Sequence, residues 1–428
     1  MRKLFAIPLA GAVLMGCAAA AFFYWPASLE PVAASPLQPT GAALVAKGRY
    51  LATAADCIAC HTVPGGKAFA GGRPFELPFG TMYSPNITPD PETGLGEWSD
   101  AEFVRALHDG VGRHGEDLYP AFPYTSYALL STDDALAIKA YLATLAPVRA
   151  VTPENSLIFP FNQRPLMRAW KLLFVPGEPL EPDPTRDAVW NRGVYLARAL
   201  AHCGECHTPR NLMFATKSDE EFAGAPVDGW KAYNITSDKL AGVGSWTDDE
   251  LKSYLSTGHA ENRGGATGGM AEAIDLSLRH LTGDDISALV SYLRSVPARP
   301  SALGDAVVSD APAVAASGAW SPPVAEPDTL GSRIFAGSCA SCHGWDGTGQ
   351  QVANAALKGA LTVNDPEGSN IIRAVLQGSK IGSPNGDLFM PSFAAMSDVE
   401  IAAVGNYVLG HFGSNKGLIS PANVAEAR

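Results

Sequence analysis

The sequence predicts a mostly α-helical chain, in which three tandem small helical domains follow an N-terminal signal or anchor segment. One five-residue motif, Cys-x-x-Cys-His, occurs three times, and its first cysteines are 146 and 136 residues apart. An amphipathic helical pattern closes the stretch after each copy, and no run of alternating apolar and polar residues marks a large sheet. Spacings of this size leave one small domain for each motif.

The N-terminal segment, residues 1–34, is expected to export the chain. Two positive charges precede an uncharged run, Leu4–Trp25, which as a helix would reach roughly 33 Å and cross a bilayer. The same pattern is typical of a cleaved signal peptide, with small residues at 33–35 as its cleavage site. A lipoprotein-type site with acylation on Cys17 is a third alternative. All three alternatives predict export of residues 35–428.

Each predicted domain ends in an amphipathic helix with a tyrosine near its end. These helices are expected at Asp133–Leu145, Asp284–Ser295 and Asp398–Gly410. Capping boxes, which satisfy free N–H groups at a helix start, are expected at Ser99 with Glu102, Thr247 with Glu250, and Ser397 with Glu400. The first two domains also repeat the block Asn-Ile-Thr. The predicted domains are 40–150, 185–297 and 328–412, and a tail follows at 413–428.

Two linkers are expected between these domains. The second, 298–327, is rich in Ala, Pro and Ser and should be a solvated strap. The first, 151–184, holds seven Pro residues but also the apolar stretch Leu166–Val175. That stretch is either a helix packed between domains or a surface that touches a partner subunit or the membrane.

Composition excludes one class of function. The net charge is −12 and no Lys/Arg run or basic patch occurs, which argues against binding to nucleic acid. With 46% apolar residues, the chain is long enough for several domains that each have a core.

The repeated motif uses six of the seven cysteines. They are Cys57, Cys60, Cys203, Cys206, Cys339 and Cys342. Cys-x-x-Cys-His is the attachment sequence of c-type haem. Two thiols on one turn of helix can add to the two vinyl groups of a porphyrin, and the next histidine then faces the iron. We therefore expect three covalent haem c groups, with His61, His207 and His343 as iron ligands.

Disulfides, a zinc site and a redox dithiol are the alternatives for these cysteines. A structural zinc site has separated ligand pairs, and a redox dithiol is a single motif in a βαβ context. Three matches that use every cysteine of the exported part favour haem. Attachment of haem outside the cytoplasm also agrees with the export signal.

A methionine opposite the histidine completes many electron-transfer haems and raises their reduction potential. It should lie in the loop before the closing helix. Met270, in Gly-Gly-Met-Ala-Glu, holds that position in the second domain, and Met390, in Phe-Met-Pro-Ser-Phe, holds it in the third. We predict that both bind iron.

The first domain breaks this pattern. Phe122 stands where the methionine is expected, and a phenyl ring cannot bind iron. Met82, His114 and His108 could supply the ligand from other parts of the domain. Otherwise the first haem is five-coordinate.

These motifs resemble the tri-haem cytochrome c subunit of membrane-bound quinone-linked dehydrogenases that oxidise alcohols, aldehydes, gluconate, fructose or sorbitol. The likeness runs from about residue 42 to 412 and includes the haem motifs, both Asn-Ile-Thr blocks and the segments 206–211, 268–272 and 390–393. It implies a separate catalytic subunit that feeds electrons through this chain to ubiquinone. It also implies a location at the periplasmic face of the bacterial inner membrane.

Alcohol-type members of that family commonly have Tyr-Pro-Ala-Met-Pro-Tyr where this sequence has Phe122. The version with Phe, together with Trp-Lys-Ala-Tyr-Asn at 230–234, resembles cytochromes that accompany molybdenum-containing aldehyde or N-heterocycle dehydrogenases. The resemblance thus favours an aldehyde-type partner, of the molybdenum type with an iron-sulfur subunit, over an alcohol-type one. The family's first methionine ligand cannot be carried over.

The chain is expected to pass electrons rather than to oxidise a substrate. No catalytic residues are predicted, because neither a dinucleotide-binding glycine loop nor a nucleophile–base pair occurs. Two alternatives stay open. An open iron at the first haem would make the chain a haem peroxidase, or the chain is a free-standing or oxidase-associated cytochrome.

Overall fold

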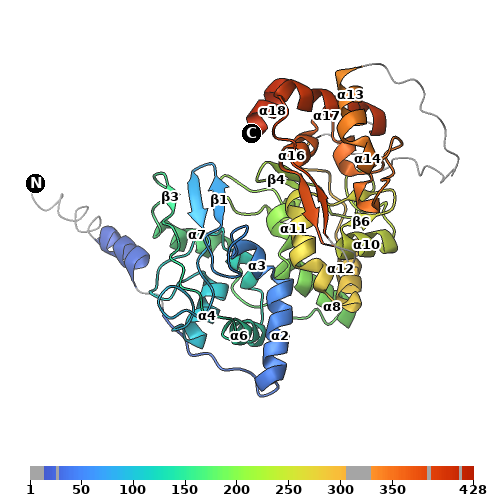
Figure 1. Ribbon diagram of the computed structural model, residues 1–428. Coiled ribbons are helices and arrows are strands. Elements are labelled where there is room, and N and C mark those ends of the chain that lie inside the picture. Colours follow the sequence, from blue (N-terminus) through green and yellow to red (C-terminus); the bar gives the residue numbers. More distant parts are fainter. Residues whose placement is uncertain (1–13, 26–27, 305–328, 383–386, 414–416) are drawn as a thin grey trace, which may run out of the picture. The chain divides into compact units, whose positions relative to one another are not determined.

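The structure is a computed structural model that describes residues 14–25, 28–304, 329–382, 387–413 and 417–428 (Figure 1). It divides into two compact units, Met1–Glu181 and Pro182–Arg428. Helices dominate both units, as the sequence predicts. Most of the predicted second linker and the start of the export segment lie outside the described residues.

The first unit combines helices with one small sheet. Its helices are α2 (Gly41–Ala54), α3 (Cys57–Cys60), α4 (Asp100–Asp109), α5 (Tyr124–Tyr127), α6 (Thr132–Leu142) and α7 (Leu166–Phe174). Strands β1 (Pro74–Leu77), β2 (Gly80–Tyr83) and β3 (Ser156–Leu157) form an antiparallel sheet in that order, with Phe75 opposite Met82. Residues 40–150 of this unit are called the first segment.

The second unit contains the middle segment, residues 185–297, and the last segment, residues 328–412. The middle segment comprises α8 (Ala188–Val194), the π-helix η1 (Tyr195–Leu200), α9 (Cys203–His207), η2 (Ser218–Glu220), β4 (Ala225–Val227), β5 (Trp230–Ala232), α10 (Asp248–Thr257), β6 (His259–Ala260), β7 (Gly264–Gly265), α11 (Gly268–Leu276), η3 (Leu278–His280) and α12 (Gly283–Ser295). The last comprises α13 (Leu330–Ser338), α14 (Ala340–His343), η4 (Ala353–Ala355), α15 (Leu361–Asn364), α16 (Ser369–Gln377), β8 (Ser379–Ile381), β9 (Leu388–Met390) and α17 (Asp398–Phe412), and α18 (Pro421–Ala427) follows it.

One helix crossing occurs in all three segments. The first helix of each segment packs on the closing helix through a glycine: Gly48 on Ala137, Gly193 on Ala288 and Gly331 on Ala403. A Cβ atom at these glycines would lie 1.8, 2.0 and 2.2 Å from the carbonyl oxygen of that alanine. Real atoms do not approach so closely, so only glycine permits the crossing. Four residues after each alanine, the predicted tyrosine lies beside the same glycine.

The closing helices and their caps agree with the sequence. They are α6, α12 and α17, and each begins within one residue of its predicted start. All three predicted capping boxes form: the Ser99, Thr247 and Ser397 hydroxyls each accept from the N–H three residues later, and the glutamate there accepts from the cap N–H. Local sequence therefore determines where these helices start.

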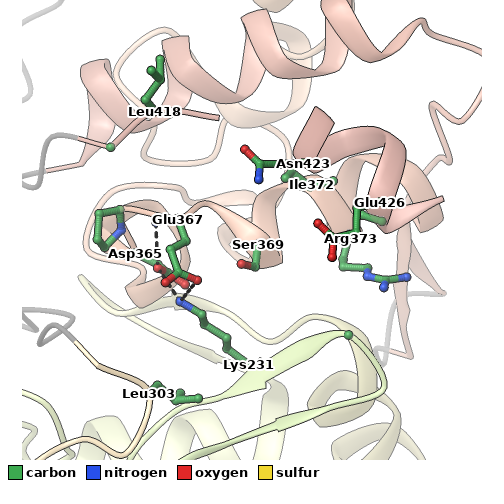
Figure 2. A pocket seen from close by; sticks show the side chains of 14 residues that line it. Lys231, Leu303, Asp365, Glu367, Ser369, Ile372, Arg373, Leu418, Asn423 and Glu426 are labelled. Carbon is green, nitrogen blue, oxygen red and sulfur yellow. Dashed lines mark hydrogen bonds and ion pairs between the residues drawn. The ribbon is translucent and has the colours of Figure 1, made fainter. Parts of the chain in front are cut away.

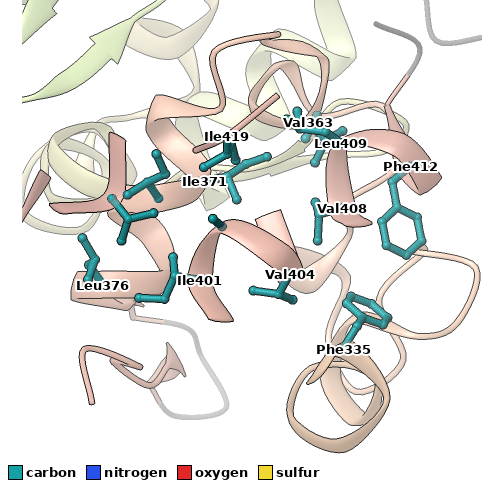
Figure 3. Packing of buried hydrophobic residues seen from close by; sticks show 14 of the residues in the cluster. Phe335, Val363, Ile371, Leu376, Ile401, Val404, Val408, Leu409, Phe412 and Ile419 are labelled. Atoms are coloured by element: carbon teal, nitrogen blue, oxygen red, sulfur yellow. The ribbon is translucent and has the colours of Figure 1, made fainter. Parts of the chain in front are cut away.

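The core of the last segment lies between helices α13, α16 and α17 (Figure 3). Phe335 comes from α13, Ile371 from α16, and Ile401 and Leu409 from α17; all four are buried. Full burial of one such side chain stabilises a fold by roughly 1.5–3 kcal/mol. Val424 of α18 joins the same cluster and so ties the C-terminal helix to this segment.

Helix α7, in the first predicted linker, has one buried and one exposed face. On one face Trp170 is only 5% exposed, and Lys171 pairs with Asp117 at 2.6 Å. On the other face Leu172 and Leu173 are 72% and 67% exposed. Arg168 of α7 also donates to the carbonyl oxygens of residues 22 and 25, at 2.8 and 2.5 Å, where the helix of residues 14–24 ends.

Within the residues that the structure describes, no helix is both long enough and apolar enough to cross a membrane.

Candidate haem sites

Each Cys-x-x-Cys-His motif lies on one short helix directly after the first long helix of its segment. These helices are α3, with His61 at its C-terminal cap, α9, and α14, with Cys339 at its N-terminal cap. Asp56 and His202, just before the first two motifs, adopt left-handed backbone with φ of 50° and 38°. That sharp break lets the motif helix leave the axis of the preceding helix. All seven cysteines lie in the described residues, and none forms a disulfide.

The three motif histidines share one contact. Nδ1 of His61 lies 2.8 Å from the Pro85 carbonyl oxygen. Nδ1 of His207 lies 2.6 Å from that of Tyr233, and Nδ1 of His343 lies 2.6 Å from that of Ala355. A carbonyl oxygen only accepts, so Nδ1 carries the proton and Nε2 keeps the lone pair that a metal needs. All three histidines are therefore oriented as haem ligands should be.

Burial keeps these imidazoles neutral. It lowers the pKa of His61, His207 and His343, and the hydrogen bond to the backbone carbonyl opposes that shift only in part. The neutral imidazole is the form that binds iron. The electrostatics of the three sites therefore agree with the geometry.

Burial raises the pKa of four of the motif thiols. Burial raises the pKa of Cys57 to about 12 and that of Cys203 and Cys339 to about 11. It raises the pKa of Cys206 to about 12 as well. Reactive dithiols have at least one thiol with a lowered pKa. In the pair Cys203 and Cys206, where both pKa values are raised, this signature of a reactive dithiol is absent.

The first unit contains a large cavity around its motif. Its volume is about 760 Å³, and Cys57, Cys60 and His61 line it among many apolar side chains. Phe122 also lines it, at the position where a methionine was expected. A cavity with two thiols and an oriented histidine on its wall, and otherwise mostly apolar, suits a porphyrin. The residues present therefore fit a haem.

Two of the three alternative ligands for the first haem reach this cavity. Met82, on β2, is 6% exposed and lines the cavity, and His114 lines it as well. His108, on α4, is not part of the lining. That Met82 or His114 binds the iron, or that the first haem is five-coordinate, stays a prediction.

The two predicted methionine ligands are not in open loops. Met270 lies in helix α11 and Met390 ends strand β9, and both are half-buried. The expected loop before α12 is helical because residues 270–276 are good helix formers, and Gly268, with φ of 56°, starts the turn against the Trp230 ring. That these two sulfur atoms bind iron remains a prediction.

Sequence reasoning missed the carbonyl acceptors, because a backbone atom has no side-chain signature. The signal was nevertheless present in the repeated Asn-Ile-Thr blocks, since Pro85 and Tyr233 directly precede them. Asn86 donates to the Val148 carbonyl at 2.7 Å and Asn234 donates to the Arg299 carbonyl at 2.8 Å. Both asparagines also accept from the N–H two residues later. The block therefore fixes the loop that presents the acceptor to the histidine.

Comparison with known proteins agrees with this chemistry. The cytochrome c family model matches residues 45–146 and 329–411. The chain is 38% identical to the fructose dehydrogenase cytochrome subunit of Gluconobacter japonicus, over 93% of this chain and 86% of that protein. The chain belongs to the family of dehydrogenase cytochrome c subunits. As in that family, its function is electron transfer.

Other relatives of this cytochrome subunit differ in the dehydrogenase they are named for. It is 36% identical to the gluconate 2-dehydrogenase cytochrome c subunit of Pantoea cypripedii, over 90% of each chain. It is also 41% identical to a nicotinate dehydrogenase subunit of Pseudomonas putida, over 92% of this chain. The chain spans only about a third, 32%, of the length of that last relative.

Proposed function

We propose that this chain carries three covalent haem c groups and passes electrons from a dehydrogenase catalytic subunit to ubiquinone. The proposal places one haem in each of three domains, 40–150, 185–297 and 328–412. The observation that carries it is the contact of a motif histidine with a backbone carbonyl, which occurs three times at 2.6–2.8 Å. Each cysteine pair would hold the porphyrin, and each histidine would offer Nε2 to the iron.

A bound haem would supply one chemical property, the exchange of a single electron at its iron. The chain supplies the rest. Burial keeps the histidines neutral. The carbonyl acceptors fix the imidazole rings, so that the ligand geometry changes little when the electron arrives. Met270 and Met390 are proposed as the opposite ligands of the second and third haems, and Met82 or His114 as that of the first.

For the partner we propose an aldehyde-type dehydrogenase of the molybdenum kind, with an iron-sulfur subunit. Phe122 in the first domain and Trp230–Asn234 in the second support this choice over an alcohol-type partner. The relative named as a nicotinate dehydrogenase subunit, at 41% identity, also supports it, since nicotinate is an N-heterocycle.

We propose that the chain works at the periplasmic face of the inner membrane and that helix α7 touches the bilayer. The exposed Leu172 and Leu173 lie on the helix that Arg168 joins to the apolar N-terminal helix. The double variant Leu172→Asp, Leu173→Asp should sediment less with phospholipid vesicles. The matched variant Val151→Asp, at another exposed apolar residue, should not. Equal sedimentation of both variants would contradict a role for α7.

Purification of the chain with its partners tests the main proposal. Extraction in mild detergent should yield a complex with a catalytic subunit, and substrate-dependent reduction of a ubiquinone analogue should require this chain. A chain that purifies alone and does not reduce quinone would favour a free-standing or oxidase-associated cytochrome.

Phe122 supports one further candidate function, a peroxidase at the first haem, because its ring lines the cavity where a ligand would stand. Titration of the reduced chain with CO, and of the oxidised chain with peroxide, separates the two functions. Electron transfer alone predicts no peroxide turnover. A CO adduct together with peroxide turnover would establish the peroxidase.

A further inference from the structure

The middle and last segments meet through an ion pair that is buried on one side. Lys231 Nζ, on strand β5, lies 2.9 Å from Asp365 Oδ1 and 2.9 Å from Glu367 Oε2. The Asp365 side chain is 1% exposed, whereas that of Glu367 is 67% exposed. Figure 2 shows Lys231 extending from the middle segment toward both carboxylates of the last segment. The lysine thus neutralises a carboxylate that water cannot reach.

The backbone of β5 is held by the same neighbour. The Asn370 side chain, on α16, accepts from the Lys231 N–H at 2.8 Å and donates to the Lys231 carbonyl at 3.0 Å. Asn370 is itself buried. An asparagine therefore pairs with β5 as a neighbouring strand would, and fixes its position relative to the last segment.

Strand β5 leads directly to the acceptor of a haem histidine. Tyr233, which directly follows the strand, accepts the His207 Nδ1–H on its carbonyl oxygen, at 2.6 Å. Its hydroxyl lies 3.4 Å from Asp365 Oδ2. Asp365 therefore contacts the residue that accepts from His207, and Asn370 contacts Lys231, two residues before it.

The middle segment also contacts the loop that holds the histidine acceptor of the last segment. His343 donates to the carbonyl of Ala355, in η4. The preceding residue, Asn354, packs so closely on Gly265 of the middle segment that a Cβ at Gly265 would lie 2.5 Å from the Asn354 carbonyl oxygen. Each segment of the second unit thus supports the histidine acceptor of the other.

We propose that this contact, anchored by Lys231 and Asp365, sets the reduction potentials of the haems at His207 and His343 together. The inference rests on the proposed function, since it needs both haems. Hydrogen bonding to the proximal histidine and nearby buried charge are two means by which a protein tunes a haem. Here the contact between the middle and last segments supplies both the histidine hydrogen bonds and the buried charge. It therefore couples two redox centres that are 136 residues apart in sequence.

Asp365→Asn tests the charge. The variant removes the buried negative charge and leaves Lys231 in place, so the local charge becomes more positive and the reduced haem is favoured. A buried charge is screened less than one in water, so its loss shifts the one-electron equilibrium of a nearby redox centre. We therefore expect redox titration of the purified holo-chain to show at least one raised potential.

Two further variants separate charge from loosened packing. In Lys231→Met with Asp365→Asn the net charge is restored, so the potentials should return toward those of the natural chain. Glu367→Gln removes the exposed partner of the same lysine, and solvent screening should leave the potentials nearly unchanged. Unchanged potentials in Asp365→Asn, or a double variant shifted as far as the single one, would overturn the proposal.

Gly265→Ala tests the positioning of the other histidine. Its methyl group must displace Asn354, which should weaken the hydrogen bond of His343 to Ala355 and raise the potential of the third haem. Gly283→Ala, where the added methyl meets nothing within 4 Å, is the control. The same potentials and Fe–His vibration in both variants would contradict the positioning role. A haem count below three would instead refute the proposed function itself, which keeps the two failures distinguishable.

Discussion

The first and middle segments surround their motif histidines alike, but they differ at the position predicted for a second iron ligand. His61 and His207 donate to the residue before an Asn-Ile-Thr block, and Gly48 and Gly193 make the same helix crossing. At the position predicted for a methionine ligand, the first segment has Phe122 and the middle one has Met270. The geometry around the motif histidine is therefore common to the two segments, and the predicted sixth ligand is the feature that distinguishes them.

Loss of a motif histidine, which both segments have in common, should have the largest effect on electron transfer. The effect should be of similar size in the two segments. His207→Ala and His61→Ala each remove a predicted iron ligand. Each should leave one haem poorly ligated and lower the rate of electron flow to quinone by at least about tenfold. Absorption spectra and quinone reductase activity measure this. His280→Ala, at an exposed histidine of the same unit, is the control. Normal quinone reduction by His207→Ala would contradict the assignment of His207 as an iron ligand equivalent to His61.

Removal of the unshared element should affect only one segment. Met270→Ala should turn one haem high-spin and lower its potential, because the sulfur ligand favours the reduced iron. Phe122→Ala should leave every spin state as it was. Electron paramagnetic resonance of the oxidised chain distinguishes these results, with Met213→Ala, at a half-exposed methionine, as the control.

Met390→Ala extends the same test to the last segment and should also produce one high-spin haem. A spectrum and potentials unchanged in either methionine variant would refute that assignment.

The next largest effect, on the stability of the fold, is expected at the helix crossing that both segments have in common. Gly48→Ala and Gly193→Ala place a methyl group on a backbone carbonyl of the closing helix, which cannot move aside. Such overpacking typically costs about 1–3 kcal/mol. Thermal unfolding should show a loss of that size in both variants, but none in Gly283→Ala. A tolerated methyl group at one crossing only would show that the two segments pack differently.

The smallest effect is expected at the helix caps. Ser99→Ala and Thr247→Ala each remove a capping-box hydroxyl, and such losses cost about 0.5–2 kcal/mol. Both variants should unfold at slightly lower temperature, whereas Ser287→Ala, inside helix α12, should change little. An unchanged unfolding temperature in both cap variants would mean that tertiary packing alone fixes these helix starts.

Features with a local cause could be predicted from the sequence. Capping boxes and helix periodicity depend on residues a few positions apart, and the haem motif is contained in five residues. The same holds for the expectation of a mostly helical chain, although the short β-ribbons of both units gave no alternating pattern long enough to detect.

Features with a distant cause could not be predicted. Lys231 and Asp365 are 134 residues apart, and nothing in either neighbourhood indicates the other. The same is true of α7, where only the fold shows that Trp170 is buried while Leu172 is exposed. The histidine acceptors are backbone atoms, so only the repeated block beside two of them left a trace in the sequence.

The number of haems per chain tests the central claim most directly. Intact-mass spectrometry of the exported holo-chain, together with haem quantification by its pyridine adduct, should give three covalently bound haems. Conversion of Cys203 and Cys206 to Ala should reduce that number to two. A natural chain with two haems or fewer, or a variant that keeps all three, would contradict the assignment of one haem to each motif.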